Sequence, residues 1–403
     1  MNERILEAAG PLYVVFSDDW GEHMSSSQHL FQHIAREHPV IWMNTIGMRP
    51  PRLNTRDLVK IWRKLSRMCL PDRRMSRSHS AGPNVTVCQP PMLPYSRIGV
   101  IRRFNTRIVK RTLRSRVDGI SDKLKVTLVA TVPNAGDYCD ALPNARVVYY
   151  CVDDFTKWPG FDADLVCQME QRLIERADVL IAASQTLCDR LAVRGKPVYL
   201  LTHGVDVDHF GRAASVEHHC LTKIPKPRVG FFGVIDNRVD QRLLNDVARR
   251  MPNISFVFAG PVEAPVAELA KCSNVHFPGV VPYLELPAFV SGIDALLIPY
   301  KTDALGNSLS PLKLREYLVT GKPVVSTPIA EAIAHPDYVA VASDVDDWVR
   351  KLRSAVDVDV AARRSLVSSA MQGESWSHKA RLLAELCSGR SAAQMSSATV
   401  GAV

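Results

Sequence analysis

The sequence lacks the cysteine patterns that mark a disulfide framework or a zinc site. Its nine cysteines are odd in number and scattered from Cys69 to Cys387, with no CxxC motif and no Cys/His pair at zinc spacing. Disulfide scaffolds pair their cysteines, whereas scattered single thiols are typical of proteins in a reducing compartment. We therefore expect reduced thiols and a cytoplasmic location.

Long hydrophobic runs are also missing. Residues 1–10 carry two glutamates and no seven-residue apolar stretch, unlike a secretory signal. Later apolar segments such as residues 295–299 have the length of a buried strand and fall well short of the ~20 residues of a spanning helix. The sequence predicts neither an export signal nor a transmembrane segment.

Acidic residues are scarce in one part of the chain. Residues 49–125 hold 20 Lys plus Arg against 4 Asp plus Glu, a local charge of +16, whereas the whole chain has +9 and the remainder therefore −7. A basic face on a nearly balanced body indicates an anionic partner, such as nucleic acid, an acidic glycan or an anionic membrane surface. No recognised nucleic-acid module frames this segment, so we expect no nucleic-acid partner.

Strand-like and helix-like patterns alternate in both halves of the 403-residue chain, which is too long for one comfortable core. This alternation of strands and helices is typical of doubly wound parallel sheets. The predicted strands are residues 12–17, 40–43, 126–130, 147–151, 179–183 and 198–201, then 229–232, 255–259, 295–299 and 323–326. We predict an α/β protein with two Rossmann-like domains. They span residues 1–210, with the basic insert at 49–125, and 211–375, followed by a helix at 376–387 and a disordered tail at 388–403.

A possible phosphate-binding loop begins the second domain. Residues 228–240 read as a strand, a glycine, a short loop and the start of a helix. Gly233 would let the backbone approach a diphosphate, the helix start would present free N–H groups, and Arg238 would add a bidentate cation. A plain βα loop with a solvated arginine accounts for this segment equally well.

The most informative segment is residues 308–329. Lys313 and Glu316 are three residues apart near the start of a predicted helix and therefore share one face. A lysine at a helix start suits a phosphate, and a carboxylate one turn later suits paired ribose hydroxyls. Taken alone, such a pair is more commonly a surface ion pair.

These segments together resemble bacterial GT-B glycosyltransferases. Ser310-Pro-Leu-Lys-Leu-Arg-Glu-Tyr-Leu with Gly321-Lys-Pro-Val-Val is similar to the donor-site helix of that family, whose ribose-binding glutamate falls on Glu316. Gly233 and Arg238 match the diphosphate loop, and residues 177–184 with 203–206 match the domain-junction signature. The resemblance covers residues 147–329 well, residues 1–50 loosely, and the basic insert hardly at all.

The resemblance implies two Rossmann-like domains facing each other across a cleft. It also implies transfer of a sugar from a nucleotide diphosphate donor to a glycan or lipid-linked acceptor. The donor would be held by Gly233, Arg238, Lys313 and Glu316, with Tyr283 near the base. Within the family, these segments look closer to the branch that includes xanthan-type glucuronosyltransferases and teichuronic acid enzymes, which indicates cell-surface polysaccharide synthesis.

Two adjacent carboxylates follow the predicted strand at residues 147–151. The end of a parallel strand is where open α/β sheets bind ligands, so Asp153 and Asp154 are candidate catalytic residues, although such aspartates also serve as turn or cap residues. Because the family base falls on Asp153, we favour it as the base and expect Asp154 to cap or orient. The first strand-to-helix loop adds Asp18, Trp20 and His23 as candidate acceptor contacts.

Metal and cofactor signals are weak. Asp-x-Asp pairs occur four times, which shows that the pattern arises easily by chance. Lys313, Arg238 and a helix dipole would neutralise a leaving diphosphate without a metal. We expect no metal and no cofactor. A non-catalytic sugar-nucleotide-binding protein and a GT-B-like epimerase remain alternatives, because fold does not decide function.

The basic insert offers a route to a membrane. Residues 58–68 and 98–117 alternate bulky apolar residues with cations, as interfacial helices do, which predicts peripheral association with an anionic membrane surface. The alternative is a solvated basic face whose apolar side packs on the core.

Overall fold

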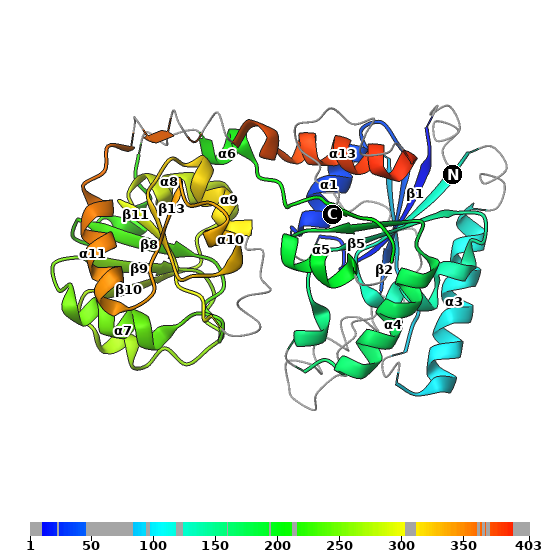
Figure 1. Ribbon diagram of the computed structural model, residues 1–403, viewed down its shortest axis with the longest axis horizontal. Coiled ribbons are helices and arrows are strands. Elements are labelled where there is room, and N and C mark those ends of the chain that lie inside the picture. The colour runs from blue at the N-terminus through cyan, green and yellow to red at the C-terminus, as the bar shows by residue number, and fades with distance from the viewer. Residues whose placement is uncertain are drawn as a thin grey trace. The chain divides into compact units, whose positions relative to one another are not determined.

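The computed structural model describes residues 10–21, 24–45, 84–93, 97–117, 124–158, 160–192, 195–211, 216–302, 312–360, 363–364, 367 and 371–389. Within these ranges the chain divides into two compact units, shown in Figure 1. Unit 1 comprises residues 1–202 and 376–403, and unit 2 comprises residues 203–375. The predicted boundary at residue 210 therefore lies a few residues after the division, and the C-terminal helix returns to unit 1.

Unit 1 is built on a parallel sheet. Its described strands lie in the order β3-β2-β1-β4-β5-β6-β7. The strands are β1 (Leu12–Ser17), β2 (Val40–Asn44), β3 (Val85–Cys88), β4 (Val126–Ala130), β5 (Arg146–Cys151), β6 (Val179–Ala182) and β7 (Val198–Leu200). Every residue of β1 is buried, because helices cover both faces of a parallel sheet.

The helices of unit 1 follow strand ends, as crossover connections require. They are α1 (Ser26–Ile34), α3 (Gly99–Val117), α4 (Ala163–Arg176), α5 (Gln185–Ala192) and α13 (Trp376–Ser388). Ser25 caps α1 by accepting a hydrogen bond from the backbone N–H of Gln28. Helix α13 packs on α1, where the Trp376 ring stacks on His29 with centroids 4.7 Å apart.

Unit 2 repeats the arrangement with a second parallel sheet. Its described strands lie in the order β10-β9-β8-β11-β12-β13. The strands are β8 (Arg228–Phe232), β9 (Ser255–Ala259), β10 (Val275–Gly279), β11 (Ala295–Ile298), β12 (Val324–Ser326) and β13 (Val339–Val341). The helices are α6 (Val207–Gly211), α7 (Gln241–Arg250), α8 (Leu286–Ser291), α9 (Leu312–Val319), α10 (Ala330–Ile333) and α11 (Val345–Val356). One apolar core, built around β8, β9 and β11, holds the unit together.

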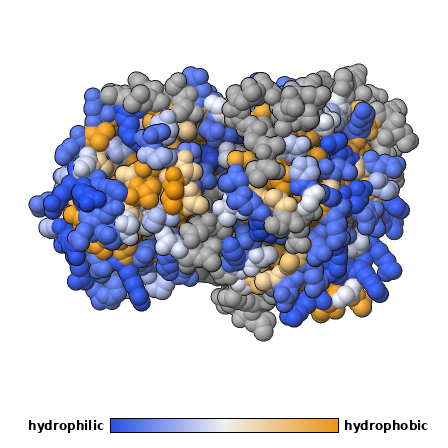
Figure 2. Space-filling model, in the orientation of Figure 1, coloured by the Kyte–Doolittle hydropathy of each residue, from blue (hydrophilic) through white to orange (hydrophobic). Residues whose placement is uncertain are grey.

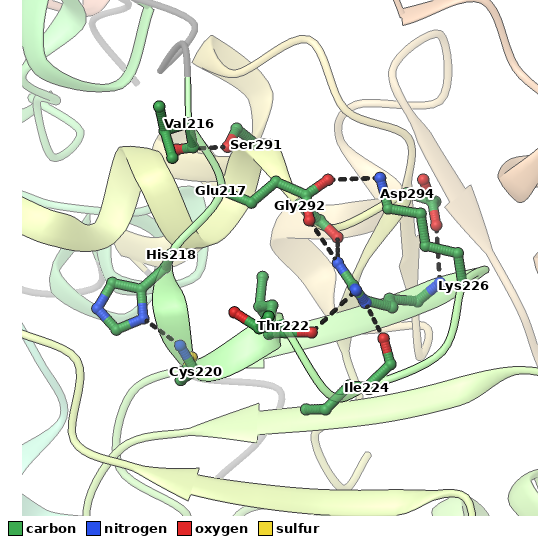
Figure 3. Close-up of polar contacts among 12 residues, drawn as sticks. Val216, Glu217, His218, Cys220, Thr222, Ile224, Lys226, Ser291, Gly292 and Asp294 are labelled. Atoms are coloured by element: carbon green, nitrogen blue, oxygen red, sulfur yellow. Dashed lines mark hydrogen bonds and ion pairs between the residues drawn. The ribbon is translucent and has the colours of Figure 1, made fainter.

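A buried arginine fixes the segment that leads into β8. The Arg228 guanidinium donates to the backbone carbonyls of Ile224 and Leu221 at 2.8 and 2.9 Å, and it lies 2.8 Å from a Glu217 carboxylate oxygen. Figure 3 shows these contacts. Because buried charges are costly unless paired, the network explains why a strand of the core can begin with arginine.

The predicted fold class is confirmed: two parallel α/β sheets. Strands β1, β2, β4 to β9, β11 and β12 lie where the hydrophobic runs placed them, within a residue or two. Three strands were not anticipated, namely β3 inside the basic insert, β10 and β13. The segment at 98–117 forms α3. The predicted membrane segment at 58–68 lies outside the described residues. Of the predicted tail at 388–403, Ser388 is the last residue of α13, and residues 390–403 lie outside the described residues. No helix in the described part of the chain is long and apolar enough to span a membrane.

Candidate functional site

The clearest candidate site in unit 2 is the meeting of Gly233 and Lys313. Gly233 follows β8 with φ +127°, a conformation that favours glycine, and a Cβ there would lie 2.0 Å from Lys313 Cε. Lys313, in the first turn of α9, thus extends directly over the glycine. Its ammonium lies 5.6 Å from the Phe231 ring centroid. A glycine backbone without a side chain and the Lys313 ammonium thus lie together, and both are groups that bind phosphate.

Glu316 lies one helical turn beyond the lysine. It is 8% exposed, and burial raises the pKa of its carboxyl to about 7, while the nearby Lys313 charge opposes that rise. Ionising a buried carboxyl is costly when no opposite charge is strong enough to restore its ordinary pKa. Such strain commonly marks a functional site.

Neighbouring charges hold α9 in place. The Arg315 side chain is 4% exposed and lies 2.6 Å from a Glu331 oxygen and 3.0 Å from a Glu374 oxygen. Burial alone would raise the pKa of Glu331, but the Arg315 charge and the hydrogen bonds from His335 and Arg315 together outweigh burial and lower that pKa to about 2. Adjacent residues of α9 therefore have opposite environments: Arg315 is paired on both sides, whereas Glu316 has only a partial counter-charge.

The Arg238 side chain, which the sequence analysis assigned to the diphosphate, already forms an ion pair within its own loop. Its guanidinium lies 2.6 Å from Asp236, an ion pair within the same loop, and 6.0 Å from the Tyr300 ring centroid. Burial raises the pKa of Asp236, but hydrogen bonds and charge from Arg238, with a contribution from Lys313, lower it overall. Asp236 was missed because a single aspartate in a loop carries no sequence signal.

Tyr283 belongs to an aromatic cluster in unit 2. It lies in the 3-10 turn η8 (Tyr283–Glu285), and its ring stacks on His209 with centroids 4.5 Å apart. His209 Nε2 also lies 2.9 Å from the Tyr283 carbonyl oxygen, so this nitrogen carries the proton and donates. Burial, with the charges of Glu316 and Asp206, raises the pKa of the Tyr283 hydroxyl. The half-exposed ring thus lies near the Glu316 carboxyl.

A second pair of contacts holds η8. His218 Nδ1 accepts from the Cys220 N–H at 3.2 Å, so a neutral ring carries its proton on Nε2, which donates to Glu285 at 2.8 Å. With His219 these side chains have the types of a metal site. A metal on Nε2 would move the proton to Nδ1, against the Cys220 N–H, so the arrangement fits a hydrogen-bonded pair better.

In unit 1 the two aspartates after β5 differ sharply. Asp154 is 2% exposed, accepts from the backbone N–H of Thr156 at 3.3 Å, and lies 3.3 Å from the Lys157 ammonium. These contacts cap the 3-10 turn η5 (Phe155–Lys157). Asp153 is partly exposed and accepts from the backbone N–H of Asp154 at 2.7 Å. Asp154 therefore has a structural role, and Asp153 stays the predicted base.

The first loop of unit 1 is internally bonded. Asp18 accepts from Ser25 Oγ at 2.9 Å and from Gln28 Nε2 at 2.9 Å, and Trp20 is 9% exposed with its ring 4.7 Å from that of Trp42. These contacts explain both residues as supports of the loop. Their contact with an acceptor stays a prediction, and His23 lies outside the described residues.

Comparison with known proteins identifies a family domain in unit 2. Residues 226–357 match the family model for glycosyl transferases group 1. A Bacillus subtilis (strain 168) protein, TuaH, named as a candidate glycosyltransferase of teichuronic acid biosynthesis, is 28% identical over 176 residues. The match covers 41% of this chain and 44% of TuaH, so it spans less than half of each protein.

Solved structures share the whole fold at low identity. Sucrose-phosphate synthase from Thermosynechococcus elongatus has a TM-score of 0.69 and 14% identity, covering 94% of this chain and 98% of its own. Anabaena Alr3699/HepE in complex with UDP has a TM-score of 0.62 and 13% identity, covering 94% of this chain and 100% of its own. The chain therefore has the GT-B fold and carries a group 1 glycosyltransferase domain in its second unit.

Proposed function

We propose, from that fold and domain, that this chain transfers a sugar from a nucleotide diphosphate donor onto a glycan or lipid-linked acceptor. The observation that carries the proposal is the arrangement of Lys313 over Gly233 with Glu316 one turn away. All three lie within the matched domain, as do Arg238 and Tyr283. The Anabaena structure contains UDP, which makes UDP-sugars the first donors to test.

Each donor contact follows from the chemistry of its side chain. The Lys313 ammonium and the Gly233 backbone would bind the diphosphate. The Glu316 carboxylate would accept hydrogen bonds from two ribose hydroxyls, which are stronger when the acceptor is ionised. The Tyr283 ring would stack on the base, as aromatic side chains do on any base.

The transfer would proceed by displacement at the anomeric carbon. Asp153 would take the proton of the acceptor hydroxyl as its oxygen bonds to that carbon. The bond between that carbon and the diphosphate oxygen breaks, and Lys313 with Arg238 would stabilise the charge that the leaving nucleoside diphosphate gains. No metal enters this scheme.

The wider role that we propose is cell-surface polysaccharide synthesis at the inner face of a membrane. The likeness to TuaH supports the polysaccharide role. The cationic helix α3 supports peripheral attachment, since its sequence holds seven Lys and Arg and no Asp or Glu.

A donor screen followed by product analysis tests the proposal. A nucleotide sugar at ~100 times its dissociation constant should stabilise the protein by about 2.7 kcal/mol in thermal unfolding. The stabilising donor is then incubated with lipid acceptors. Transfer supports the proposal, whereas binding without turnover or release of an epimer would favour one of the two alternative functions.

A further inference from the structure

A large cavity lies at the opposite end of the unit 1 sheet from Asp153. It has a volume of about 830 Å³, and it is lined by residues where β1, β4 and β5 begin and where α13 ends. Figure 1 shows the end of α13, in red, near the start of β1. Open α/β sheets bind their substrates at the carboxyl ends of the strands, where Asp153 lies. The cavity is therefore separate from the proposed acceptor region.

Arg146 begins β5 and lines this cavity. Its guanidinium lies against Gly389, where an added Cβ would be 2.7 Å from Arg146 Nη1. The Nε atom is buried, and none of the described residues accepts a hydrogen bond from this side chain or forms an ion pair with it. Burial raises the pKa of the neighbouring Cys387 thiol to about 12 even against the Arg146 charge, so that thiol is neutral and cannot balance it. A partly buried guanidinium without a partner is costly.

Thr127 adds a second unpaired group beside the arginine. It is the register partner of Arg146 between β4 and β5. Thr127 lines the cavity and is only 4% exposed, yet its hydroxyl has no hydrogen-bond partner among the described residues. Buried hydroxyls normally have one. Lys125 and Asn144 bring further donors to the rim, and the described lining contains no Asp or Glu.

Two simpler explanations cover only part of these observations. Cations are ordinary at a surface, and Figure 2 shows hydrophilic residues over most of the described face of unit 1 in that view. A cation at the end of a helix is also favourable, because the C-terminus of α13 carries partial negative charge. Neither explains why the donors of Arg146 lack an acceptor, or why a buried hydroxyl beside them is unpaired.

We propose that this cavity is a second ligand site, which binds a small molecule that carries a phosphate group. The Arg146 fork matches two phosphate oxygens, the Thr127 hydroxyl donates to the same group, and Lys125 adds charge at the rim. The cavity volume falls in the range of ~300 to 1,000 Å³ that is usual for small-molecule sites. A bound ligand would join the starts of β4 and β5 to the end of α13. The site uses none of the residues of the proposed transfer reaction and is independent of it.

Hydrogen exchange with inorganic phosphate as the probe locates the site. Every protein in the series carries Lys313→Ala, which removes the ammonium of the proposed donor site. Phosphate, compared with chloride at equal ionic strength, should slow amide exchange in the last turn of α13 and at the starts of β4 and β5. Arg146→Met should weaken this protection by roughly tenfold or more in phosphate concentration, since it loses charge-assisted hydrogen bonds. Arg146→Lys keeps the charge without the fork and should lose less.

Thr127→Val distinguishes a ligand contact from a structural role. The change keeps the side-chain shape and removes a hydroxyl that has no described partner, so the empty protein should unfold at the same temperature or higher. Protection by phosphate should nevertheless weaken several-fold. Arg111→Met, on an exposed position of α3, removes one charge from the same unit and should change neither property. Phosphate also stabilises proteins generally, because it is excluded from their surface, so only differences between variants count.

Two results would overturn the phosphate site. Equal protection of the Lys313→Ala protein with and without Arg146→Met would show that phosphate acts elsewhere. Lower unfolding temperatures for Arg146→Met and Thr127→Val, with protection by phosphate unchanged, would show that both side chains only hold α13 on the sheet. Because no sugar nucleotide is present, either result leaves the proposed transfer reaction standing, and a failed transfer assay would leave the phosphate site standing.

Discussion

Replacing Glu316 by glutamine should change nucleotide affinity and the free energy of unfolding in opposite directions. The carboxyl is buried and its pKa is raised from an ordinary 4.5 to about 7, so the ionised form is destabilised in the folded chain. At 1.36 kcal/mol for each pH unit, that rise corresponds to about 3 kcal/mol. Glu316→Gln keeps the shape and removes the charge. We therefore expect the empty variant to be more stable than the wild type by up to about 3 kcal/mol at pH 8.

The sign of the pH dependence follows from the same pKa. Between pH 4.5 and 7 the folded protein holds a proton on Glu316 that the unfolded chain has lost. The contribution of the Glu316 carboxyl to the free energy of unfolding is therefore full below pH 4.5 and is lost as pH rises through 7. The advantage of Glu316→Gln should shrink to less than about 1 kcal/mol at pH 5. Urea unfolding at pH 5 and pH 8 measures the difference.

Glu331→Gln is a control of opposite sign in the same unit. Burial raises the pKa of Glu331, but the Arg315 charge and the hydrogen bonds from His335 and Arg315 together bring that pKa to about 2. Its stabilising contribution is present above pH 4.5 and lost as pH falls through 2. The control variant should therefore be less stable than the wild type at pH 8, where Glu316→Gln is more stable.

The nucleotide should reverse the preference at Glu316. Ribose hydroxyls donate to the ionised carboxylate, so binding lowers its pKa and releases up to one proton near pH 6.5. Calorimetric titration of UDP in two buffers of different ionisation enthalpy counts that proton. Glu316→Gln should release up to one proton fewer than the wild type, because only the phosphate of UDP still titrates, and it should bind UDP more weakly by ~1.5 to 3 kcal/mol. Equal proton release in the two proteins, or a variant that is less stable at pH 8, would refute this account of Glu316.

Other substitutions probe the remaining donor contacts. Gly233→Ala should weaken UDP binding at least tenfold, because the added Cβ would displace Lys313. Gly279→Ala, which is also at positive φ but has open space around it, should bind UDP normally. Calorimetry of both variants tests this, and equal losses of affinity would point to backbone strain alone. Asp236→Asn should bind UDP about fivefold more tightly, because Arg238 loses its competing partner; weaker binding would show that Asp236 positions that arginine. Tyr283→Ala should lose ~1 to 3 kcal/mol of UDP affinity but none for pyrophosphate, and a matching loss for pyrophosphate would refute base stacking.

Much of the fold could be predicted because buried parallel strands have a strong hydrophobic signal. Strand β1 matches its predicted range of 12–17 residue for residue, and Ser25 caps α1 as its sequence indicates. The hydrophobic pattern did not predict strand β3, because Val85–Cys88 lies in the basic insert and is not part of a long apolar run. Only the last residue of this strand is buried. The return of α13 to unit 1 depends on packing against α1, which no local pattern records.

The candidate site was predictable in its residue types and not in their pairing. Spacing alone put Lys313 and Glu316 on one helical face. It could not indicate that Glu316 is buried or that Lys313 lies over Gly233, since both depend on how α9 packs on β8. Loop partners such as Asp236 escape sequence reasoning because an aspartate in a loop serves many purposes.

Product analysis with a labelled UDP-sugar tests the central claim most directly. Wild-type protein, vesicles that contain lipid acceptors and the labelled donor should yield UDP and an equal amount of labelled lipid. Asp153→Asn should reduce that yield by ~100-fold or more, the range for loss of a general base, with UDP affinity unchanged. Near wild-type transfer by Asp153→Asn would make Asp153 a turn residue. Binding of the donor by the wild type with no labelled product from any acceptor, or with an epimerised sugar instead, would contradict the assignment as a glycosyltransferase.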